Sequence, residues 1–362
     1  MYEPNFPASR PKPQRAPTIT DVARILRISR STISRAFSRP ELLSEETVRK
    51  VKQAAESIGY QPNRTARALS TGRHFNLAFV VSDVGNPFVP PILRAAQSEA
   101  DRTGYSLFLG NADESPEREW TLIDKLRLQT DGLLIVAPRL SDDKIRQIAA
   151  LKPVVLVNRD TPGIARVIID STVGIEAGVQ YLATLGHKKL VYLCGPTASW
   201  ADSQRRIAVR RACTRLKLEI DQIPTAHPDF ASGRAAAQAV HATGATAAIA
   251  FDDFVAHGLM AGLAQLGIQI PRDFSVIGCD DVLGDATHPT LTSVSSRGAE
   301  AGRLAVNLLI NRLYSGSDAD ARRTLETRLV IRASTGPAPR KSGQHTAAKA
   351  EPKPTTRAKR KS

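Results

Sequence analysis

Two guanidinium groups and several hydroxyl groups gather in one short segment near the start of the chain. Residues 29–35 read Ser-Arg-Ser-Thr-Ile-Ser-Arg, and helical spacing would bury Ile33 while Arg30, Ser31 and Arg35 face outward. Ser29 suits an N-cap, so Arg30 and Ser31 would lie at the positive end of a helix. Guanidinium forks and short hydroxyls in that position suit hydrogen bonds to phosphates and to base edges in the major groove of DNA.

Apolar spacing predicts helices on both sides of this segment. The first helix is expected to bury Val22, Ala23, Ile25 and Leu26, and the second helix, which contains Arg30 and Arg35, to bury Ile33, Ala36 and Phe37. A third helix would begin after an N-cap at Ser44 and end at Gly59. Two short helices around a tight break, sharing a core with a third helix, have the layout of a DNA-reading helix-turn-helix. The alternative is a generic helical bundle whose arginines are a solvated face.

The basic residues of the chain are concentrated in three places. The formal net charge is +15, and Lys/Arg outnumber Asp/Glu by ten to five in residues 17–72, three to one in residues 1–16 and eight to one in residues 337–362. Residues 73–336 are therefore close to neutral. This distribution predicts that the small head and the tails bind nucleic acid and that the neutral body has a different function.

The composition of the 362 residues, 42% of them hydrophobic, is that of an ordinary globular chain with two or three domains. Residues 1–16 are rich in proline and have no apolar run, so we expect neither a signal peptide nor a membrane anchor there. Cys194, Cys213 and Cys279 are scattered and predict no disulfide or metal site. The expected location is the cytoplasm.

The body alternates short apolar runs with helical stretches, which predicts a doubly wound parallel sheet covered by helices on both faces. Over some 260 residues two such lobes are more plausible than one large sheet. The predicted strands are residues 77–81, 105–109, 133–136, 154–157, 190–193, 247–250 and 275–278.

The head has a more specific signature than a helix-turn-helix alone. Thr-Ile-x-Asp-Val-Ala from Thr18, then Ser-x-x-Thr-Ile-Ser-Arg from Ser29, and then Tyr60-x-Pro62-Asn63 and Ala66-Arg67-x-Leu69 resemble the lactose/galactose/purine repressor family of bacterial transcription regulators. The resemblance extends over residues 18 to about 336. One departure is the break between the first two helices, where Leu26-Arg27 replaces a small residue followed by glycine. Arginine tolerates a positive φ poorly, so the turn is expected to be slightly strained.

The resemblance implies a bacterial, nucleoid-associated regulator, most often a repressor, that binds a near-palindromic operator as a homodimer or a tetramer. It also implies a periplasmic-binding-protein-like body that is controlled by a small-molecule effector between its lobes, with a sugar or sugar derivative as the first expectation. The residues that it assigns to DNA are Arg30, Ser31, Thr32, Arg35, Tyr60, Asn63, Ala66 and Leu69, of which Leu69 would be wedged into the minor groove. The expected domains are a disordered extension (1–16), a helix-turn-helix domain (17–61), a hinge helix and linker (62–74), the two-lobed domain (75–336) and a disordered basic tail (337–362). In the two-lobed domain the resemblance implies that the chain crosses between the lobes three times, which we expect near residues 171, 292 and 317.

Ligands of parallel sheets bind at the carboxyl ends of the strands, where this chain has polar and aromatic residues. By the resemblance, Phe88 and Phe230 would stack on the effector, Arg205 and Asp280 would clamp it, and Asn158 and Asp252 would contribute from the strand ends. Some of these groups have blander interpretations. Asp160, Asp170 and Asp253 suit helix N-caps, and Phe88 suits a turn packed on its own lobe.

No catalytic motif, metal-ligand spacing or cofactor-binding signature stands out, so no enzyme activity, cofactor or metal is expected. Three rival interpretations remain open. The body alone would suit a solute-binding protein for uptake. The basic tails and the leucine wedge would suit an architectural DNA protein without a ligand, and a third possibility is a regulator whose cleft binds nothing small.

Overall fold

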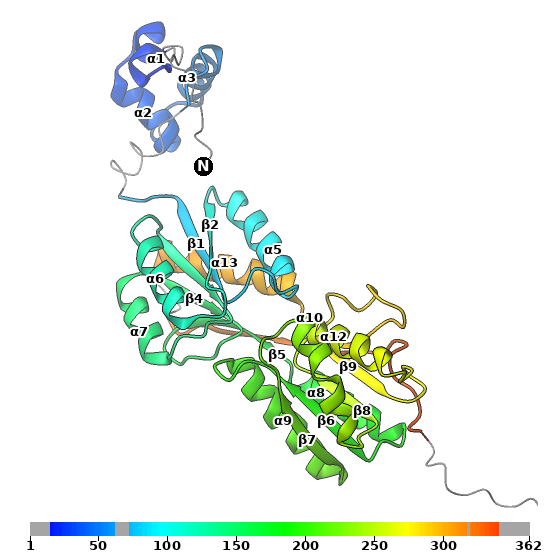
Figure 1. Ribbon diagram of the computed structural model, residues 1–362. Helices are drawn as coiled ribbons and strands as arrows, with labels where there is room; N and C mark the ends of the chain where they lie inside the picture. The colour runs from blue at the N-terminus through cyan, green and yellow to red at the C-terminus, as the bar shows by residue number, and fades with distance from the viewer. Residues whose placement is uncertain (1–14, 62–71, 317–318, 340–362) are drawn as a thin grey trace, which may run out of the picture.

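The computed structural model describes residues 15–61, 72–316 and 319–339, which form a three-helix head and a body of two α/β lobes (Figure 1). The predicted fold class, an all-α head and a two-lobed α/β domain with doubly wound parallel sheets, is confirmed. Asn63, Ala66 and Leu69 of the expected hinge lie outside the described residues, as do residues 1–14 and 340–362 of the expected tails. Within the described ranges, no helix is long and apolar enough to cross a membrane.

The head consists of three α-helices and one short 3-10 helix. Val22, Ile33 and Val51, one from each α-helix, are fully buried at its centre. Each α-helix begins with a capping side chain: Thr18 forms a reciprocal capping box with Asp21, and the hydroxyls of Ser29 and Ser44 accept backbone N–H groups. The elements are α1 (Ile19–Leu26), α2 (Arg30–Ser38), η1 (Pro40–Leu42) and α3 (Glu45–Ser57).

Two details of the head bear on the predictions. Ile25 is 52% exposed, so the prediction that it is buried is wrong. Its neighbours Val22 and Leu26 lie on the stripe that faces α2 and α3, whereas Ile25 lies to the side of that stripe. The turn after α1 does adopt a left-handed conformation at Arg27, with φ of 54°, as the missing glycine led us to expect.

The N-terminal lobe contains a sheet of six parallel strands in the order β11-β5-β4-β3-β1-β2. Alternate residues of its strands enter different cores: Leu77 and Phe79 pack on one face of the sheet, and Ala78 and Val80 on the other. Its strands are β1 (Asn76–Val81), β2 (Ser106–Asn111), β3 (Gly132–Val136), β4 (Val154–Val157), β5 (Ala165–Asp170) and β11 (Arg322–Glu326). Its helices are α5 (Val89–Arg102), α6 (Pro116–Leu126), α7 (Asp142–Leu151) and α13 (Gly298–Ser315).

The C-terminal lobe repeats this arrangement with strand order β12-β10-β9-β8-β6-β7, in which only the short β12 is antiparallel. Leu190 and Tyr192 of β6 face one core, and Val191 and Leu193 face the other. Its strands are β6 (Lys189–Cys194), β7 (Glu219–Pro224), β8 (Ala247–Ala250), β9 (Ser275–Asp280), β10 (Thr292–Ser295) and β12 (Leu329–Val330). Its helices are α8 (Thr172–Thr184), α9 (Trp200–Leu216), α10 (Phe230–Ala235), α11 (Ala237–Ala242) and α12 (Asp253–Gln265).

The chain passes between the lobes at three places. The first passage is at Ser171, between β5 and α8, where it was predicted. The second follows β10 and so comes just after the predicted position at Thr292. The third comes after Glu326 rather than near Ser317, because residues 322–326 form a parallel edge strand beside β5 and keep the chain in the N-terminal lobe.

Candidate functional site

The outward face of α2 presents the polar side chains that the sequence singled out. Arg30, Ser31 and Arg35 are exposed, and Thr32 is half-buried. The Ser29 hydroxyl accepts the backbone N–H of Thr32 at 3.1 Å, which fixes the start of the helix. No ion pair between described residues engages Arg30 or Arg35, so their full charge is available to an anionic partner.

Tyr60 lies at the other end of the head. Its ring packs edge-on against Phe37, with the ring centroids 5.9 Å apart, and its backbone N–H bonds to the carbonyl of Ala55. This packing ties the end of the head to the core that carries α2 and brings the chain to the point where the expected hinge begins.

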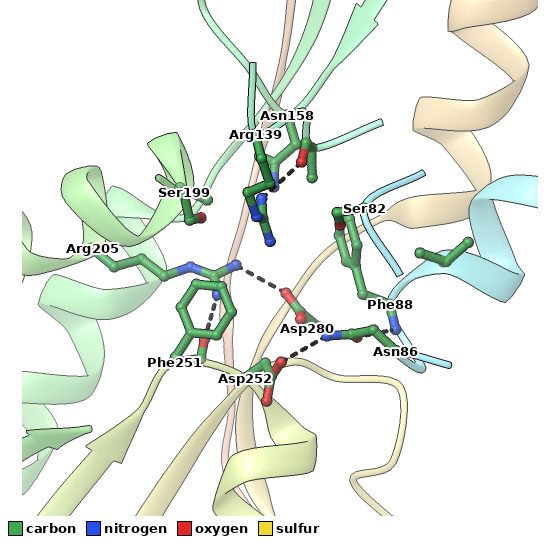
Figure 2. A pocket seen from close by; sticks show the side chains of 13 residues that line it. Ser82, Asn86, Phe88, Arg139, Asn158, Ser199, Arg205, Phe251, Asp252 and Asp280 are labelled. Carbon is green, nitrogen blue, oxygen red and sulfur yellow. Dashed lines mark hydrogen bonds and ion pairs between the residues drawn. The ribbon is translucent and has the colours of Figure 1, made fainter. Parts of the chain in front are cut away.

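A cleft between the two lobes collects the carboxyl ends of several strands (Figure 2). Five of the six predicted effector-binding residues line it: Phe88, Asn158, Arg205, Asp252 and Asp280. The other lining residues are Ser82, Asn86, Val89, Ala137, Arg139, Ser199, Ala201 and Phe251.

Phe230 is the sixth predicted effector-binding residue, and it does not line the cleft, so the prediction that it stacks in the cleft is not met by its position here. Phe230 is 36% exposed at the start of α10 and packs against Phe254, with the ring centroids 6.3 Å apart. In the cleft the second aromatic ring belongs instead to Phe251, which directly follows β8.

Arg205 is the centre of the C-terminal wall of the cleft. It is only 3% exposed, and its guanidinium lies over the ring of Phe251, 4.9 Å from the centroid. Each of its nitrogens has a partner: Nη2 donates to Asp280 Oδ1 at 3.0 Å, Nε donates to the Ser171 hydroxyl at 3.3 Å, and Nη1 donates to the Phe251 carbonyl. The buried charge is thus both paired and hydrogen-bonded.

Asp252 links the two lobes across the cleft. Its Oδ1 caps α12 by accepting the Val255 N–H at 2.8 Å, and its Oδ2 accepts Asn86 Nδ2 from the N-terminal lobe at 3.0 Å (Figure 2). Burial, and then the nearby Asp280 carboxylate, raise the pKa of Asp252 to about 7. Asp252 is therefore both a helix cap and a cleft residue.

The neighbouring carboxylates have structural partners. Asp253 Oδ2 accepts the backbone N–H groups of Val282 and Leu283, which holds the loop after β9. Asp170 accepts the N–H of Thr172 at the start of α8, and Asp160 forms an ion pair with Arg166. The N-cap interpretation is wrong for all three residues. The N-cap of α8 is Ser171, which follows Asp170, the N-cap of α12 is Asp252, which precedes Asp253, and the element after Asp160 is a strand.

Arg139 is a cleft residue that sequence reasoning missed. Its Nε and Nη2 form a bidentate pair with Glu114 at 2.6 and 2.8 Å, and its Nη1 donates to the Ala137 carbonyl at 2.7 Å. Beneath it, buried Glu119 accepts the N–H groups of Arg139 and Leu140, and burial raises the pKa of Glu119 to about 7. The sequence did contain a signal for Arg139, because this residue closely follows the predicted strand 133–136 and ligands of parallel sheets bind at the carboxyl ends of the strands.

The backbone is strained where three strands reach the cleft. Ala137 after β3, Asn158 after β4 and Asp280 at the end of β9 have φ values of 48°, 59° and 105°. Non-glycine residues seldom adopt such angles, and strain of this kind clusters at ligand sites. These backbone conformations occur where strands of both lobes reach the same cleft.

The space between these side chains is narrow. The room between the lining atoms is about 380 Å³ with the open mouth included, but only about 30 Å³ of it admits the centre of a water molecule. A cavity needs roughly 10–15 Å³ of such room for each water. The cleft in this conformation holds a few waters, so a larger molecule requires the lobes or side chains to move.

Comparison with known proteins identifies the class. Residues 18–63 match the model described as bacterial regulatory proteins, lacI family, and residues 179–335 match the periplasmic binding protein-like domain. The chain belongs to the lacI family of bacterial regulatory proteins.

The relatives span almost the whole chain. The HTH-type transcriptional repressor CytR of Escherichia coli (strain K12) is 29% identical over 333 residues, which cover 90% of this chain and 98% of CytR. PurR of Vibrio cholerae is 30% identical over 306 residues, which cover 82% of this chain and 91% of PurR. Both relatives are transcriptional repressors of the helix-turn-helix type.

Solved structures show the same architecture. The lac repressor dimer bound to operator and the anti-inducer ONPF superposes with a TM-score of 0.80 at 25% identity, covering 89% of this chain and 100% of that one. The complex of the transcriptional regulator CelR with cellobiose superposes with a TM-score of 0.67 at 27% identity, covering 88% and 99%.

Proposed function

We propose that this protein is a transcriptional repressor that binds a near-palindromic operator as a homodimer and responds to a small molecule in the interlobe cleft. The observation that carries the proposal is that Arg30 and Arg35 are exposed on a capped helix of a lacI-family head and form no ion pair with any residue that the structure describes. Guanidinium groups in this setting donate to base edges and to phosphates. The dimer and operator of the lac repressor structure support the same assembly here.

In the DNA complex, Arg30, Ser31 and Arg35 would read bases in the major groove, and Thr32 and Tyr60 would contact the backbone. The hinge would supply Asn63, Ala66 and Leu69, with Leu69 entering the minor groove. An apolar wedge between base pairs costs a few kcal/mol of unstacking, which the contacts made to the bent DNA offset. These assignments rest on the family motif, because the hinge lies outside the described residues.

The cleft is the effector site in this proposal, and a sugar or sugar derivative is its ligand. The rings of Phe88 and Phe251, the amides of Asn86 and Asn158, and the buried carboxylates provide stacking surfaces and hydrogen-bond partners for a polar ring. The CelR complex, which contains cellobiose, supports a carbohydrate ligand.

Control would work through a shift in the population of lobe arrangements. The Asn86–Asp252 hydrogen bond holds the lobes together across a cleft too small for a sugar ring, so an effector must compete with this bond on entry. A change in the angle between lobes would alter how two hinges meet in a dimer and hence DNA affinity. The protein would act on DNA in the bacterial cytoplasm, without catalysis.

Selection of bound sequences from random DNA by the full chain tests this proposal. The selection is run with and without a small-molecule extract of bacterial cells. We expect one near-palindromic sequence to be enriched, and its recovery to change when extract is present. Enrichment of no sequence in either condition would contradict the proposed function.

A further inference from the structure

The charges that line the cleft are already matched within the protein. Both guanidinium groups of the cleft wall have a carboxylate partner: Arg205 pairs with Asp280 and Arg139 pairs with Glu114. All three nitrogens of each group have a hydrogen-bond partner from the protein. An anionic ligand would have to displace a protein carboxylate to pair with either arginine.

Backbone N–H groups at the N-termini of the helices around the cleft also have hydrogen-bond acceptors within the protein. Ser199 Oγ accepts the Asp202 N–H at the start of α9, Asp252 Oδ1 accepts the Val255 N–H at the start of α12, and Asn86 Oδ1 accepts the Phe88 N–H before α5. Exposed N–H groups at helix starts are what usually bind phosphates and carboxylates. Here side chains of the protein already accept from these groups.

The hydrogen-bond acceptors of the cleft, in contrast, are not all matched by donors of the described residues. Asn158 is 5% exposed and lines the cleft, and its Oδ1 has no hydrogen-bond partner among the described residues. A buried carbonyl oxygen without a donor costs free energy. Asp252 has only the neutral donors Asn86 and Val255, and no ion pair between described residues engages it. Both groups favour a ligand that brings N–H or O–H donors.

Among the lining residues, the carboxyl groups are Asp252 and Asp280 and the guanidinium groups are Arg139 and Arg205. Glu114, which lies outside the lining, offsets the charge of Arg139, and Asp280 offsets that of Arg205. A ligand with its own negative charge would therefore meet no unmatched guanidinium group among the lining residues and would lie close to the Asp280 carboxylate.

We infer that the effector is an uncharged, donor-bearing molecule, such as an unmodified sugar, and that the cleft excludes its phosphorylated and carboxylated counterparts. This inference rests on the proposed function of the cleft as the effector site. Asn158 is the residue that receives a ligand donor, and Glu114 is the residue that keeps Arg139 from attracting anions.

Thermal unfolding of the full chain with inorganic phosphate as the probe tests the exclusion without knowledge of the effector. Sodium phosphate is titrated against sodium chloride at equal ionic strength, for the wild type, Arg139→Gln, Glu114→Gln and the double variant. Phosphate bound to the basic head and tails shifts all four proteins alike, so only the differences between variants report on the cleft.

We expect phosphate to shift the wild type and Arg139→Gln equally, to raise the melting temperature of Glu114→Gln further, and to lose that gain in the double variant. A wild-type shift that Arg139→Gln abolishes would overturn the inference, as would a folded Glu114→Gln that behaves like the wild type. The comparison of wild type with Arg139→Gln decides the matter even where Glu114→Gln does not fold.

Matched ligand pairs complete the test. The same assay compares D-ribose with ribose 5-phosphate, and D-glucose with glucose 6-phosphate and with glucuronate. Stabilisation by a neutral member that Asn158→Ala weakens supports the inference, and stabilisation by a charged member alone overturns it. If no member of any pair raises the melting temperature, the result would count against the proposed effector function. The phosphate titration would still decide whether the cleft excludes anions.

Discussion

The head and the cleft use arginine in opposite ways. On α2, Arg30 and Arg35 are exposed and have no ion-pair partner among the described residues. In the cleft, Arg139 and Arg205 are buried, and every nitrogen has a partner within the protein. The same residue type therefore offers its charge to a polyanion in one region and shapes a neutral site in the other. Burial and pairing, rather than residue type, decide which partner an arginine selects.

The largest expected effect comes from removing the buried arginine of the cleft. Arg205→Ala leaves Asp280 buried without its cation, so we expect the free energy of unfolding of the body to fall by about 3–5 kcal/mol. Arg211→Ala removes an exposed arginine that pairs with Glu176 and should cost less than about 1 kcal/mol. Denaturant unfolding measures both, and equal losses would remove the contrast between buried and exposed arginines.

A second test follows from the carboxylate that has no cation. The pKa of Asp252 is raised from 3.8 to about 7, so the folded protein holds a proton between these pH values that the unfolded chain has released. Its stabilising contribution is present below pH 3.8 and is lost as the pH rises to about 7. Wild-type stability should therefore fall over this window relative to Asp252→Asn, by at most about 1.4 kcal/mol per pH unit.

Denaturant midpoints of the two proteins across the same pH range provide the measurement. Asp253 and Glu119, whose pKa values burial also raises to about 7, are present in both proteins, so the difference isolates Asp252. A difference that stays constant with pH would show that Asp252 is ionised throughout.

Removing a charge from the head should act on DNA and not on folding. Arg30→Ala is expected to lose about 1–3 kcal/mol of binding free energy on the selected operator and to relax the preference at one base pair. Lys52→Ala, which removes an exposed charge from α3, is the matched control. Equal weakening on every DNA sequence would assign Arg30 to phosphate contact only.

The smallest expected effect concerns the bond between the lobes. Asn86→Ala removes the donor to Asp252 and should favour the open arrangement by about 0.5–1.5 kcal/mol. Small-angle scattering would detect this as an increase in the radius of gyration of the ligand-free protein. An unchanged radius would show that the hydrogen bond does not control closure.

Sequence patterns predicted the regular parts of the fold well. The apolar runs predicted β1, β3 and β4 of one sheet and β6, β8 and β9 of the other, because parallel strands are buried on both faces. The edge strands β7 and β11 escaped this rule, since Glu-Ile-Asp-Gln-Ile-Pro and Arg-Arg-Thr-Leu-Glu are polar and largely accessible. β5 was missed because Arg166, buried by its pairs with Asp160 and Asp320, interrupts the apolar pattern.

The site was harder to predict than the fold. Residues adjacent to recognisable strands, such as Asn158 and Asp280, could be placed at the cleft from the strand pattern. Phe251 and Phe230 could not be told apart, since both follow or precede regular elements and only packing shows which ring faces the cleft. The pairing of Arg139 with Glu114 joins two loops that are 25 residues apart, and no sequence pattern predicts it.

The most direct test of the central claim is a comparison of operator and scrambled DNA at physiological salt. The full wild-type chain is titrated onto the selected operator and onto a scrambled duplex of equal length and composition. We predict at least about a thousandfold tighter binding to the operator, as specific regulators show. Equal affinity for the two duplexes would mean that Arg30, Ser31 and Arg35 bind DNA without reading it, and would contradict the account.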